Sequence, residues 1–422
     1  MIAEVISDRE QTRDAAVGEV TSKWGGKQVL IGPWIVVPYD VVSVEEVGDG
    51  GPVERRVTRY ASFLPDQLDV SGSLIGEERY RGIYEVPVFR TELEFSGRFA
   101  RPTFTGWSVA EGAQRWDRAF LAFRVSDAGA ILNKASISWN DREIDFHPGV
   151  GEGYSHQAGI HVPLTGALKG DDFAFSFDLQ LNGSEGLFFA PYGKQTSVNI
   201  TSNWPDPGFD GQWLPDAREI RGDGFTARWH VPFLGRNYPQ RWRSDESVDQ
   251  VVGDSLFGVR LVTMVDNYRM AHRSVKYEFL FLVLTFATLW LFEVLSCVRI
   301  HPLQYLLLGA AMCLFYLLEL SLAEHIGFLG AYVVASSMVV SLMASYSRFV
   351  LGTTARAGIA GLVVGLLYSF LYILLSSQDY ALLAGALGLF VALALVMFLT
   401  RNVDWYGDQA PGDGPTQDAD SR

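Results

Sequence analysis

The sequence predicts an all-β, sandwich-like domain followed by an α-helical bundle that spans a membrane. Hydrophobic residues make up 48% of the 422-residue chain and charged residues only 19%, below the roughly 25% typical of soluble proteins. The polar and aromatic residues lie before about Lys276, whereas residues 277–400 are almost continuously apolar. Within the first part, polar and apolar residues alternate with a period of two, which is typical of half-buried strands.

The first segment, residues 1–24, resembles a polar helix. It contains DREQTRDAAVGEV and lacks the apolar stretch that an export signal requires. The orientation derived below nevertheless places the next domain outside the cytoplasm. We therefore expect this helix to be the remnant that follows a missing membrane helix, absent through truncation or a misplaced start.

Residues 25–275 form the predicted β-rich domain. Turn signals separate its apolar runs, for example the glycine-rich segment 48–51, Asn182-Gly183-Ser184 and Gly222-Asp223-Gly224. Many short strands with Gly and Pro turns indicate one large sandwich or two smaller ones. The predicted strands are Lys27–Pro38, Ile83–Phe95, Ala119–Val125, Ala135–Phe146, Asp172–Leu181, Ser197–Trp204 and Thr226–Val231.

Residues 277–400 contain five apolar stretches, each long enough to cross a hydrocarbon core that needs about 20 residues. A short polar segment ends each stretch, so we predict a bundle of five transmembrane helices. The Gly-, Pro- and Asp-rich segment 401–422 is predicted to be a disordered cytoplasmic tail. The predicted helices are 277–298, 303–322, 327–346, 358–376 and 380–400.

The charges of the short connections alternate along the bundle and predict its orientation. The second and fourth connections contain acidic residues, Glu324 and Asp379. Basic connections belong in the cytoplasm, which places the C-terminus there and residues 25–275 in the periplasm of a bacterial inner membrane. The basic residues are Arg299 and His301, then Arg348 and Arg356, and finally Arg401.

Ionisable residues inside membrane segments are candidate functional sites. Glu293 lies near the cytoplasmic end of its helix, where an interhelical hydrogen bond is the favoured interpretation and a proton relay the alternative. Glu319 lies nearer the outer face, where water could reach it. Glu324 and His325 form a predicted loop pair, either solvated or in a pH-sensitive contact.

Small residues recur at a spacing of four and predict close helix packing. Ser337, Ser341 and Ser345 do so on the third helix, and Gly361 and Gly365 on the fourth. Nothing in these segments resembles a broken helix with a midplane site, so a transporter has weak support. On the fifth helix the small residues are Ala381, Ala384, Gly385 and Gly388.

The segment TSNWPDPGFDGQWLPD, Thr201–Asp216, is stiff and aromatic. One hypothesis is a recognition loop for a glycan or protein. The favoured alternative is a loop anchored by its tryptophans, which closes one end of the sandwich. The candidate recognition residues are Trp204, Asp206, Phe209, Trp213 and Asp216.

Motifs for catalysis or cofactor binding are absent from the sequence: there is no H-E-x-x-H, G-x-S-x-G or Walker sequence. His147, His156 and His161 share a glycine-rich loop, but their spacing permits a metal site without indicating one, and we predict no metal or cofactor. The net charge of −14 argues against nucleic acid. The two cysteines, Cys297 and Cys313, both lie in the apolar half, so the β-rich domain has no disulfide.

Several segments resemble the CreD family of bacterial inner-membrane proteins. The matching segments include GPWIVVPY, FLPDQLDVSG, RGIYEVPVF, GIHVPL, the tryptophan-containing loop, KYEFLFLVLTFATLWLFEVLS, RIHPLQYLLLG, SLAEHIGFLGAY and FLTRNVDWY. The resemblance implies an N-terminal membrane helix, a periplasmic domain and a C-terminal bundle. It also implies a role in cell-envelope integrity, under two-component control and linked to colicin tolerance and β-lactam response. The family has no established catalytic residue, and this chain departs from it at the start, where the first helix should be.

We therefore expect a non-enzymatic protein of envelope integrity and stress response, anchored in membrane lipid. Its β domain is expected to bind a periplasmic protein or cell-wall glycan. One alternative is an enzyme that modifies envelope glycans, which needs two carboxylates about 5–9.5 Å apart in a cleft. The other is a small-molecule transporter, in which Glu293, Glu319 or Ser337 would line a wet cavity.

Overall fold

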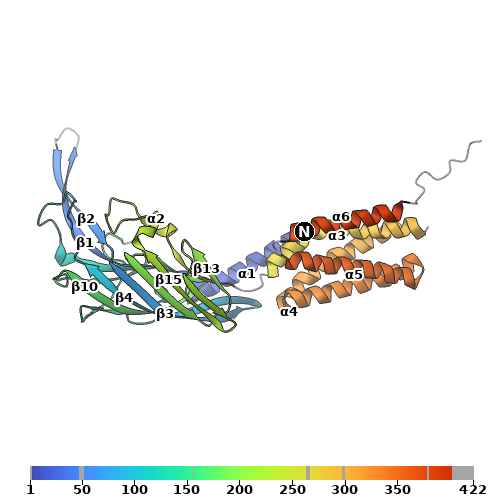
Figure 1. The fold of residues 1–422 in the computed structure, drawn as a ribbon, viewed down its shortest axis with the longest axis horizontal. Coiled ribbons are helices and arrows are strands. Elements are labelled where there is room, and N and C mark those ends of the chain that lie inside the picture. The colour runs from blue at the N-terminus through green and yellow to red at the C-terminus, as the bar shows by residue number, and fades with distance from the viewer. Residues whose placement is uncertain are drawn as a thin grey trace, which may run out of the picture. The chain divides into compact units, whose positions relative to one another are not determined.

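The structure is a computed structural model that describes residues 2–46, 52–154, 156–262, 267–296, 300–377 and 380–401. The chain forms two compact units, and each is described by itself (Figure 1). The β unit comprises Arg13–Met264, and the helical unit comprises Met1–Thr12 together with Val265–Arg422. Several sequence predictions lie outside the described residues: the turn at 48–51, Cys297, Arg299, Asp379 and residues 402–422 of the tail.

The β unit contains two sheets, whose strands pair antiparallel except for β1 with β11 and β12 with β3. The nine-stranded sheet has the order β13 (Pro207–Gly211), β17 (Phe257–Leu261), β11 (Gly186–Phe189), β1 (Gln28–Glu46), β5 (Phe120–Val125), β9 (Gly159–Pro163) and β8 (His147–Pro148), with β2 (Pro52–Phe63) and β16 (Arg241–Arg243) branching from β1. The eight-stranded sheet has the order β14 (Ala217–Arg221), β15 (Gly224–Pro232), β12 (Gln195–Ser202), β3 (Gln67–Arg81), β4 (Tyr84–Ala100), β10 (Asp172–Ser184), β6 (Ser136–Trp139) and β7 (Arg142–Asp145).

The two sheets share one hydrophobic core, as the predicted sandwich requires. Along β10 the side chains alternate, so that Phe175 and Phe177 are buried while Asp178 is exposed. Phe123 of the nine-stranded sheet packs edge-on against Phe95 and Phe177 of the other sheet, with ring centroids 5.0 and 5.3 Å apart. Because aromatic side chains bury large areas, such contacts dominate the packing energy. The predicted all-β domain is therefore confirmed.

Helix α1 (Ile2–Trp24) covers the predicted polar helix, but it belongs to both units. In the β unit, Trp24 donates its indole N–H to the carbonyl of Phe89 at 3.2 Å. The guanidinium of Arg79 lies 3.7 Å from the Trp24 ring centroid. The division between the two units falls within this helix, after Thr12.

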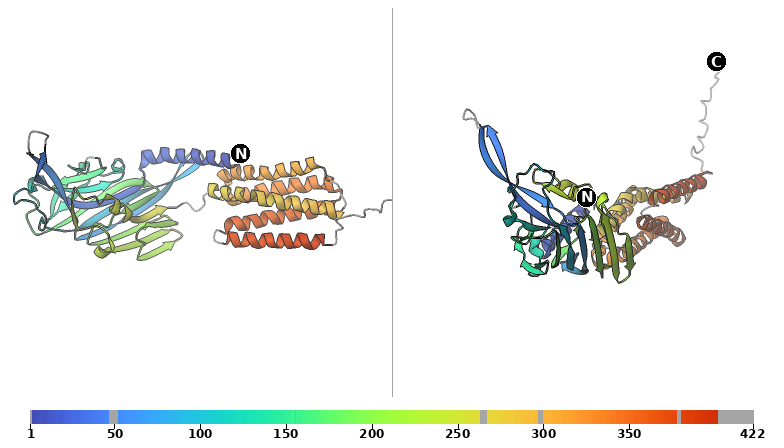
Figure 2. Two further views of the ribbon diagram at one scale, coloured as in Figure 1. Left: turned by 90° about the horizontal axis from the view of Figure 1, so that it is seen from above. Right: turned by 60° about the vertical axis from the view of Figure 1, so that its left-hand side comes forward.

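The helical unit has four described helices that are long and apolar enough to cross a membrane. These are α3 (Asn267–Ser296), α4 (Pro302–Leu351), α5 (Thr354–Ser376) and α6 (Ala381–Thr400) (Figure 2). The sequence predicted five segments, and the structure places the second and third of them within α4. This element is interrupted at Gly327, whose φ of 72° and ψ of 164° are not helical.

The two parts of α4 fold back on each other at Gly327. The Phe315 and Tyr332 ring centroids are 5.4 Å apart, whereas the same two positions in a straight helix would be separated by about 25 Å. Each part is about 36 Å long at 1.5 Å per residue, enough to cross a hydrocarbon core of about 30 Å. The conformational freedom of glycine at positive φ permits this turn.

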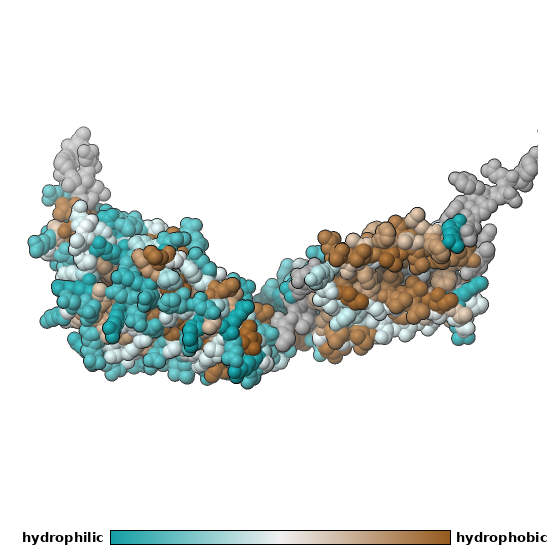
Figure 3. Space-filling view, in the orientation of Figure 1, coloured by the Kyte–Doolittle hydropathy of each residue, from teal (hydrophilic) through white to brown (hydrophobic). Residues whose placement is uncertain are grey.

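The outer surface of the helical unit is mostly hydrophobic, whereas that of the β unit is mostly hydrophilic (Figure 3). The predicted packing through Ser337, Ser341 and Ser345 is wrong, because all three serines are exposed. The Ser337 and Ser345 hydroxyls instead donate to carbonyls of their own helix, at 2.6 and 2.7 Å, which satisfies them without a neighbour. The buried face of this segment carries Ala331, Ala335, Val339 and Met343.

Candidate functional site

The predicted recognition loop, Thr201–Asp216, is a crossing between the two sheets. It leaves the eight-stranded sheet at the end of β12 and joins the edge of the nine-stranded sheet as β13, which pairs with β17. The loop therefore contains a strand that the sequence did not predict. Pairing with β17 gives the backbone of residues 207–211 hydrogen-bond partners.

Trp204 is buried at one end of the sandwich and is only 8% exposed. Its indole N–H donates to the carbonyl of Val262 at 3.0 Å. Its ring lies against Gly76, where a Cβ atom would be 2.6 Å from the ring. This tryptophan closes the sandwich, in agreement with the favoured interpretation of the loop, and presents little surface to a partner.

The other candidate residues of the loop are dispersed. Phe209 packs edge-on against Phe225 and Trp229, with centroids 5.7 and 5.8 Å apart. Trp213 is half-buried beside Gly235. The structure therefore does not bring the five candidates to one surface. Asp206 is half-buried, and exposed Asp216 accepts a hydrogen bond from the His230 backbone N–H at 2.8 Å.

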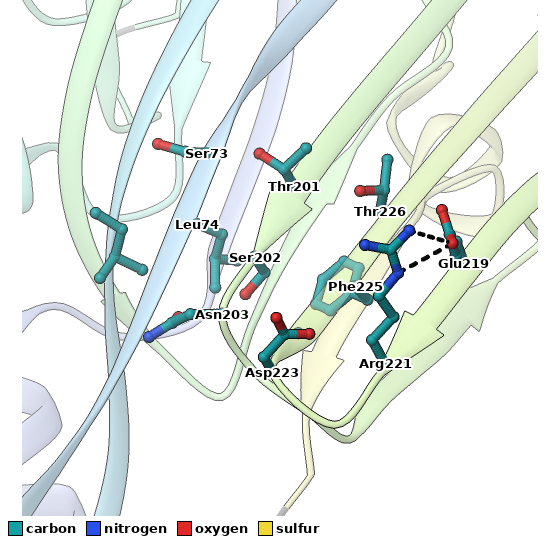
Figure 4. A pocket seen from close by; sticks show the side chains of 12 residues that line it. Ser73, Leu74, Thr201, Ser202, Asn203, Glu219, Arg221, Asp223, Phe225 and Thr226 are labelled. Carbon is teal, nitrogen blue, oxygen red and sulfur yellow. Dashed lines mark hydrogen bonds and ion pairs between the residues drawn. The ribbon is translucent and has the colours of Figure 1, made fainter.

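A polar cleft lies next to this crossing, on the outer face of the eight-stranded sheet (Figure 4). Its volume is about 520 Å³. Strand register aligns four polar side chains across it: Thr201 pairs with Ser73 on one side and with Thr226 on the other, and Thr226 pairs with Glu219. Side chains at paired positions point to the same face of a sheet. The four therefore form one row, which we call the hydroxyl row.

A second polar row runs parallel to the hydroxyl row, two residues along each strand. Asn199 pairs with Ser71 and with Arg228. The side-chain oxygen of Asn199 is buried and has no hydrogen-bond partner among the described residues. A buried acceptor without a partner costs free energy.

The hairpin of β14 and β15 supplies the charged side of the cleft. The Arg221 guanidinium donates to one oxygen of Glu219 at 2.6 and 3.0 Å. This hydrogen bond raises the pKa of Arg221 above its ordinary value. The side chain of Asp223 lies at the turn and also lines the cleft. Sequence analysis detected this turn at 222–224 but not the strand before it, all of whose residues are exposed.

A second cleft, of about 350 Å³, lies in the histidine-containing loop. His161 makes a hydrogen bond to the carbonyl of Gly149 through Nδ1 at 2.7 Å, and its ring centroid is 5.7 Å from that of His147. His156 is exposed. Within the described residues, no three His, Cys, Asp or Glu side chains are grouped to hold a metal ion.

The candidate polar residues of the helical unit lie in different surroundings. Glu293 accepts a hydrogen bond from the Tyr305 hydroxyl at 2.9 Å, which is the interhelical hydrogen bond that the sequence favoured. Glu319 is 1% exposed, so it does not lie at the water-accessible outer face where the sequence placed it. Glu324 and His325, predicted as a loop pair, both belong to α4. The Glu324 side chain is 7% exposed and lies 3.6 Å from Arg9, so it is not solvated. His325 is exposed, as a solvated residue would be.

A polar β sandwich joined to a set of apolar, membrane-length helices defines an integral membrane protein with a large extramembrane unit. The chain matches the family described as "Inner membrane protein CreD" over residues 1–406. It is 33% identical over 413 residues to the inner membrane protein CreD of Escherichia coli (strain K12), covering 97% of this chain and 90% of that protein. The chain belongs to the CreD family of inner membrane proteins, as the resemblance in sequence implied.

Proposed function

We propose that this protein maintains the cell envelope by binding cell-wall glycan through the outer face of its eight-stranded sheet. The observation that carries the proposal is the hydroxyl row, Ser73, Thr201, Thr226 and Glu219, aligned by register across four strands. The helical unit anchors the protein in the inner membrane. Binding, rather than catalysis, is the function proposed for the cleft.

The chemistry of the cleft fits a polyhydroxylated ligand. Sugars carry hydroxyl and acetamido groups that donate and accept hydrogen bonds, and each such bond contributes about 0.5–1.5 kcal/mol. Ser73, Thr201 and Thr226 can do both. Ile75, which is 47% exposed at the same cleft, supplies an apolar contact for the face of a sugar ring.

The pairing of Glu219 with Arg221 favours binding over hydrolysis. A glycosidase needs a carboxyl group that remains protonated and can donate to the leaving oxygen. Arg221 can only donate hydrogen bonds, and its two bonds to Glu219 use this carboxyl group as an acceptor instead. Glu219 is therefore suited to accept hydrogen bonds from sugar hydroxyls.

Binding of an uncharged N-acetylglucosamine oligosaccharide to the full chain in lipid nanodiscs tests this proposal by calorimetry. The variant Ser73→Ala/Thr201→Val/Thr226→Val removes three hydroxyls and is expected to weaken binding about tenfold to a hundredfold. Because this ligand is neutral, raising the salt concentration should change the affinity little. Strong salt dependence with a basic peptide, and no oligosaccharide binding, would identify a cationic protein as the ligand instead.

A matched control lies on the same sheet. Ser138 on β6 is a half-buried residue outside the cleft, so Ser138→Ala should leave oligosaccharide affinity unchanged while Ser73→Ala weakens it. Equal effects of the two alanine variants would show that the loss is not specific to the cleft. The proposal fails if the wild-type protein binds no oligosaccharide.

We further infer that the β unit faces the periplasm. The helical unit carries basic residues at three helix ends. His301 lies between α3 and α4, Arg348 and Arg356 lie on either side of the connection between α4 and α5, and Arg401 follows α6. Basic ends of membrane helices favour the cytoplasm. In a Cys297→Ala/Cys313→Ala background, a membrane-impermeant maleimide should label Ser138→Cys in spheroplasts and label Arg401→Cys only after lysis. The reverse pattern would overturn this orientation.

A further inference from the structure

Glu319 on α4 is enclosed in the helical unit, at 1% exposure. The Ser274 hydroxyl of α3 donates to its Oε2 at 2.9 Å. The other carboxyl oxygen, Oε1, has no hydrogen-bond partner among the described residues. Ser274 is itself fully buried. One neutral donor therefore serves a carboxyl group that, if ionised, could accept about four hydrogen bonds.

Aromatic side chains lie around Glu319. Phe315 and Tyr316 precede it by about one helical turn on the same face of α4, and both are buried. The Phe315 ring centroid lies 5.4 Å from that of Tyr332, on the second part of α4, and 4.6 Å from that of Tyr368 on α5. These tyrosines are 3% and 5% exposed, so three helical segments enclose this region.

Three basic side chains of α1 and α3 have partners other than Glu319. Arg9 of α1 lies 3.6 Å from Glu324. His272 of α3 lies 3.3 Å from Glu10. Arg273, the neighbour of Ser274 in sequence, donates to the carbonyl of Leu374 on α5 at 3.0 Å.

A further carboxyl group lies on α3, one turn after Ser274. Glu278 is half-buried, and its Oε1 accepts the thiol hydrogen bond of Cys313 of α4 at 3.4 Å. It adds a second carboxyl group, not a basic side chain, to the α3–α4 interface. Among the described residues, no basic side chain donates a hydrogen bond to either oxygen of Glu319.

An ionised carboxylate in such surroundings is costly. Burying a charge without a paired cation costs several kcal/mol, and a membrane interior offers no water to offset it. The neutral carboxyl form avoids this cost. We propose that Glu319 and Ser274 form a proton-binding site in the helical unit, which keeps α3 packed on α4 when it is occupied. Proton release places an unpaired negative charge between the two helices and loosens them.

Infrared spectroscopy of the full chain in lipid tests this proposal directly. At about pH 7 ordinary carboxyl groups are ionised, so a remaining carboxylic-acid C=O band reports a protonated, buried group. The wild type should show such a band, and Glu319→Gln should lack it. Glu293→Gln, a matched change at the Tyr305-bonded carboxyl, should retain it. Identical wild-type and Glu319→Gln spectra in this region would overturn the proposal.

Two further measurements keep the proposal testable if Glu319→Gln folds poorly. Ser274→Ala removes the hydrogen bond to the carbonyl oxygen and should move the band to higher frequency, whereas an unchanged band contradicts the assignment. The thermal unfolding midpoint of the wild type should also fall as the pH rises from about 6 to 9, because the folded state binds the extra proton. A flat profile would contradict proton binding by the folded state.

Discussion

The β unit carries its polar residues on its outer surface, whereas the helical unit encloses polar residues in its interior. In the β unit, Phe95, Phe123 and Phe177 fill the interior, and the hydroxyl row lies on the outer face. In the helical unit, leucines cover the outside while Glu319 and Ser274 lie within. The solvent decides this arrangement, because water satisfies polar groups outside a soluble unit and only the protein can satisfy them in a bilayer. The comparison indicates where each unit carries its chemistry.

The largest expected effect concerns the interior of the β unit. Trp204→Ala removes a buried ring and its hydrogen bond to Val262, and should lower the free energy of unfolding of this unit by about 3–5 kcal/mol. Trp213→Ala should cost less, because that ring is half-buried. Chemical denaturation monitored by tryptophan fluorescence measures both. Equal, small costs would restore the hypothesis of a surface recognition loop.

Replacing an exposed leucine with arginine should have different effects on the outer surfaces of the two units. Leu393 of α6 is 60% exposed and Leu234 of the β unit is 92% exposed. Leu393→Arg should cost about 3 kcal/mol of membrane insertion, because it faces lipid. Leu234→Arg should change stability by less than about 0.5 kcal/mol. The membrane-bound fraction after carbonate extraction reports the first effect, and equal behaviour of the two variants would contradict a lipid-exposed α6.

A smaller effect tests packing within the helical unit. The two glycines of α5 that the sequence paired differ in surroundings: a Cβ at Gly361 would lie 2.9 Å from the Cβ of Ala344, whereas a Cβ at Gly365 meets nothing within 4 Å. Gly361→Ala should therefore destabilise the unit by about 1–3 kcal/mol. Gly365→Ala should stabilise it by up to about 1 kcal/mol through helix propensity. Thermal unfolding in detergent compares them, and effects of the same sign would refute this packing.

Sequence periodicity detected several strands that have one buried and one exposed face, such as β10 and β15, but it missed others, including β3. It also missed β11, which is buried along its whole length, and β14, which is exposed along its whole length, because neither alternates. Alternation reports a difference between two faces. Composition detected the membrane segments for a similar reason, since lipid demands a continuous apolar run.

The candidate site could not be predicted from the sequence, because it depends on strand register. Ser73, Thr201 and Thr226 are far apart in the chain and meet only through pairing of β3, β12 and β15. Each is an ordinary outward-facing residue on its own strand. For the serines at 337, 341 and 345 the sequence predicted a packing contact that the structure does not contain. Small residues permit close helix packing without requiring it.

The most direct test of the central claim is complementation in bacteria that lack their own copy of the gene. Cells are challenged with an envelope-disrupting detergent, and protein level and membrane insertion are measured in parallel. The Ser73→Ala/Thr201→Val/Thr226→Val variant should insert normally and fail to restore growth, whereas Ser138→Ala should restore it. Full restoration by the variant that lacks the three hydroxyls would contradict a role for this face in envelope integrity.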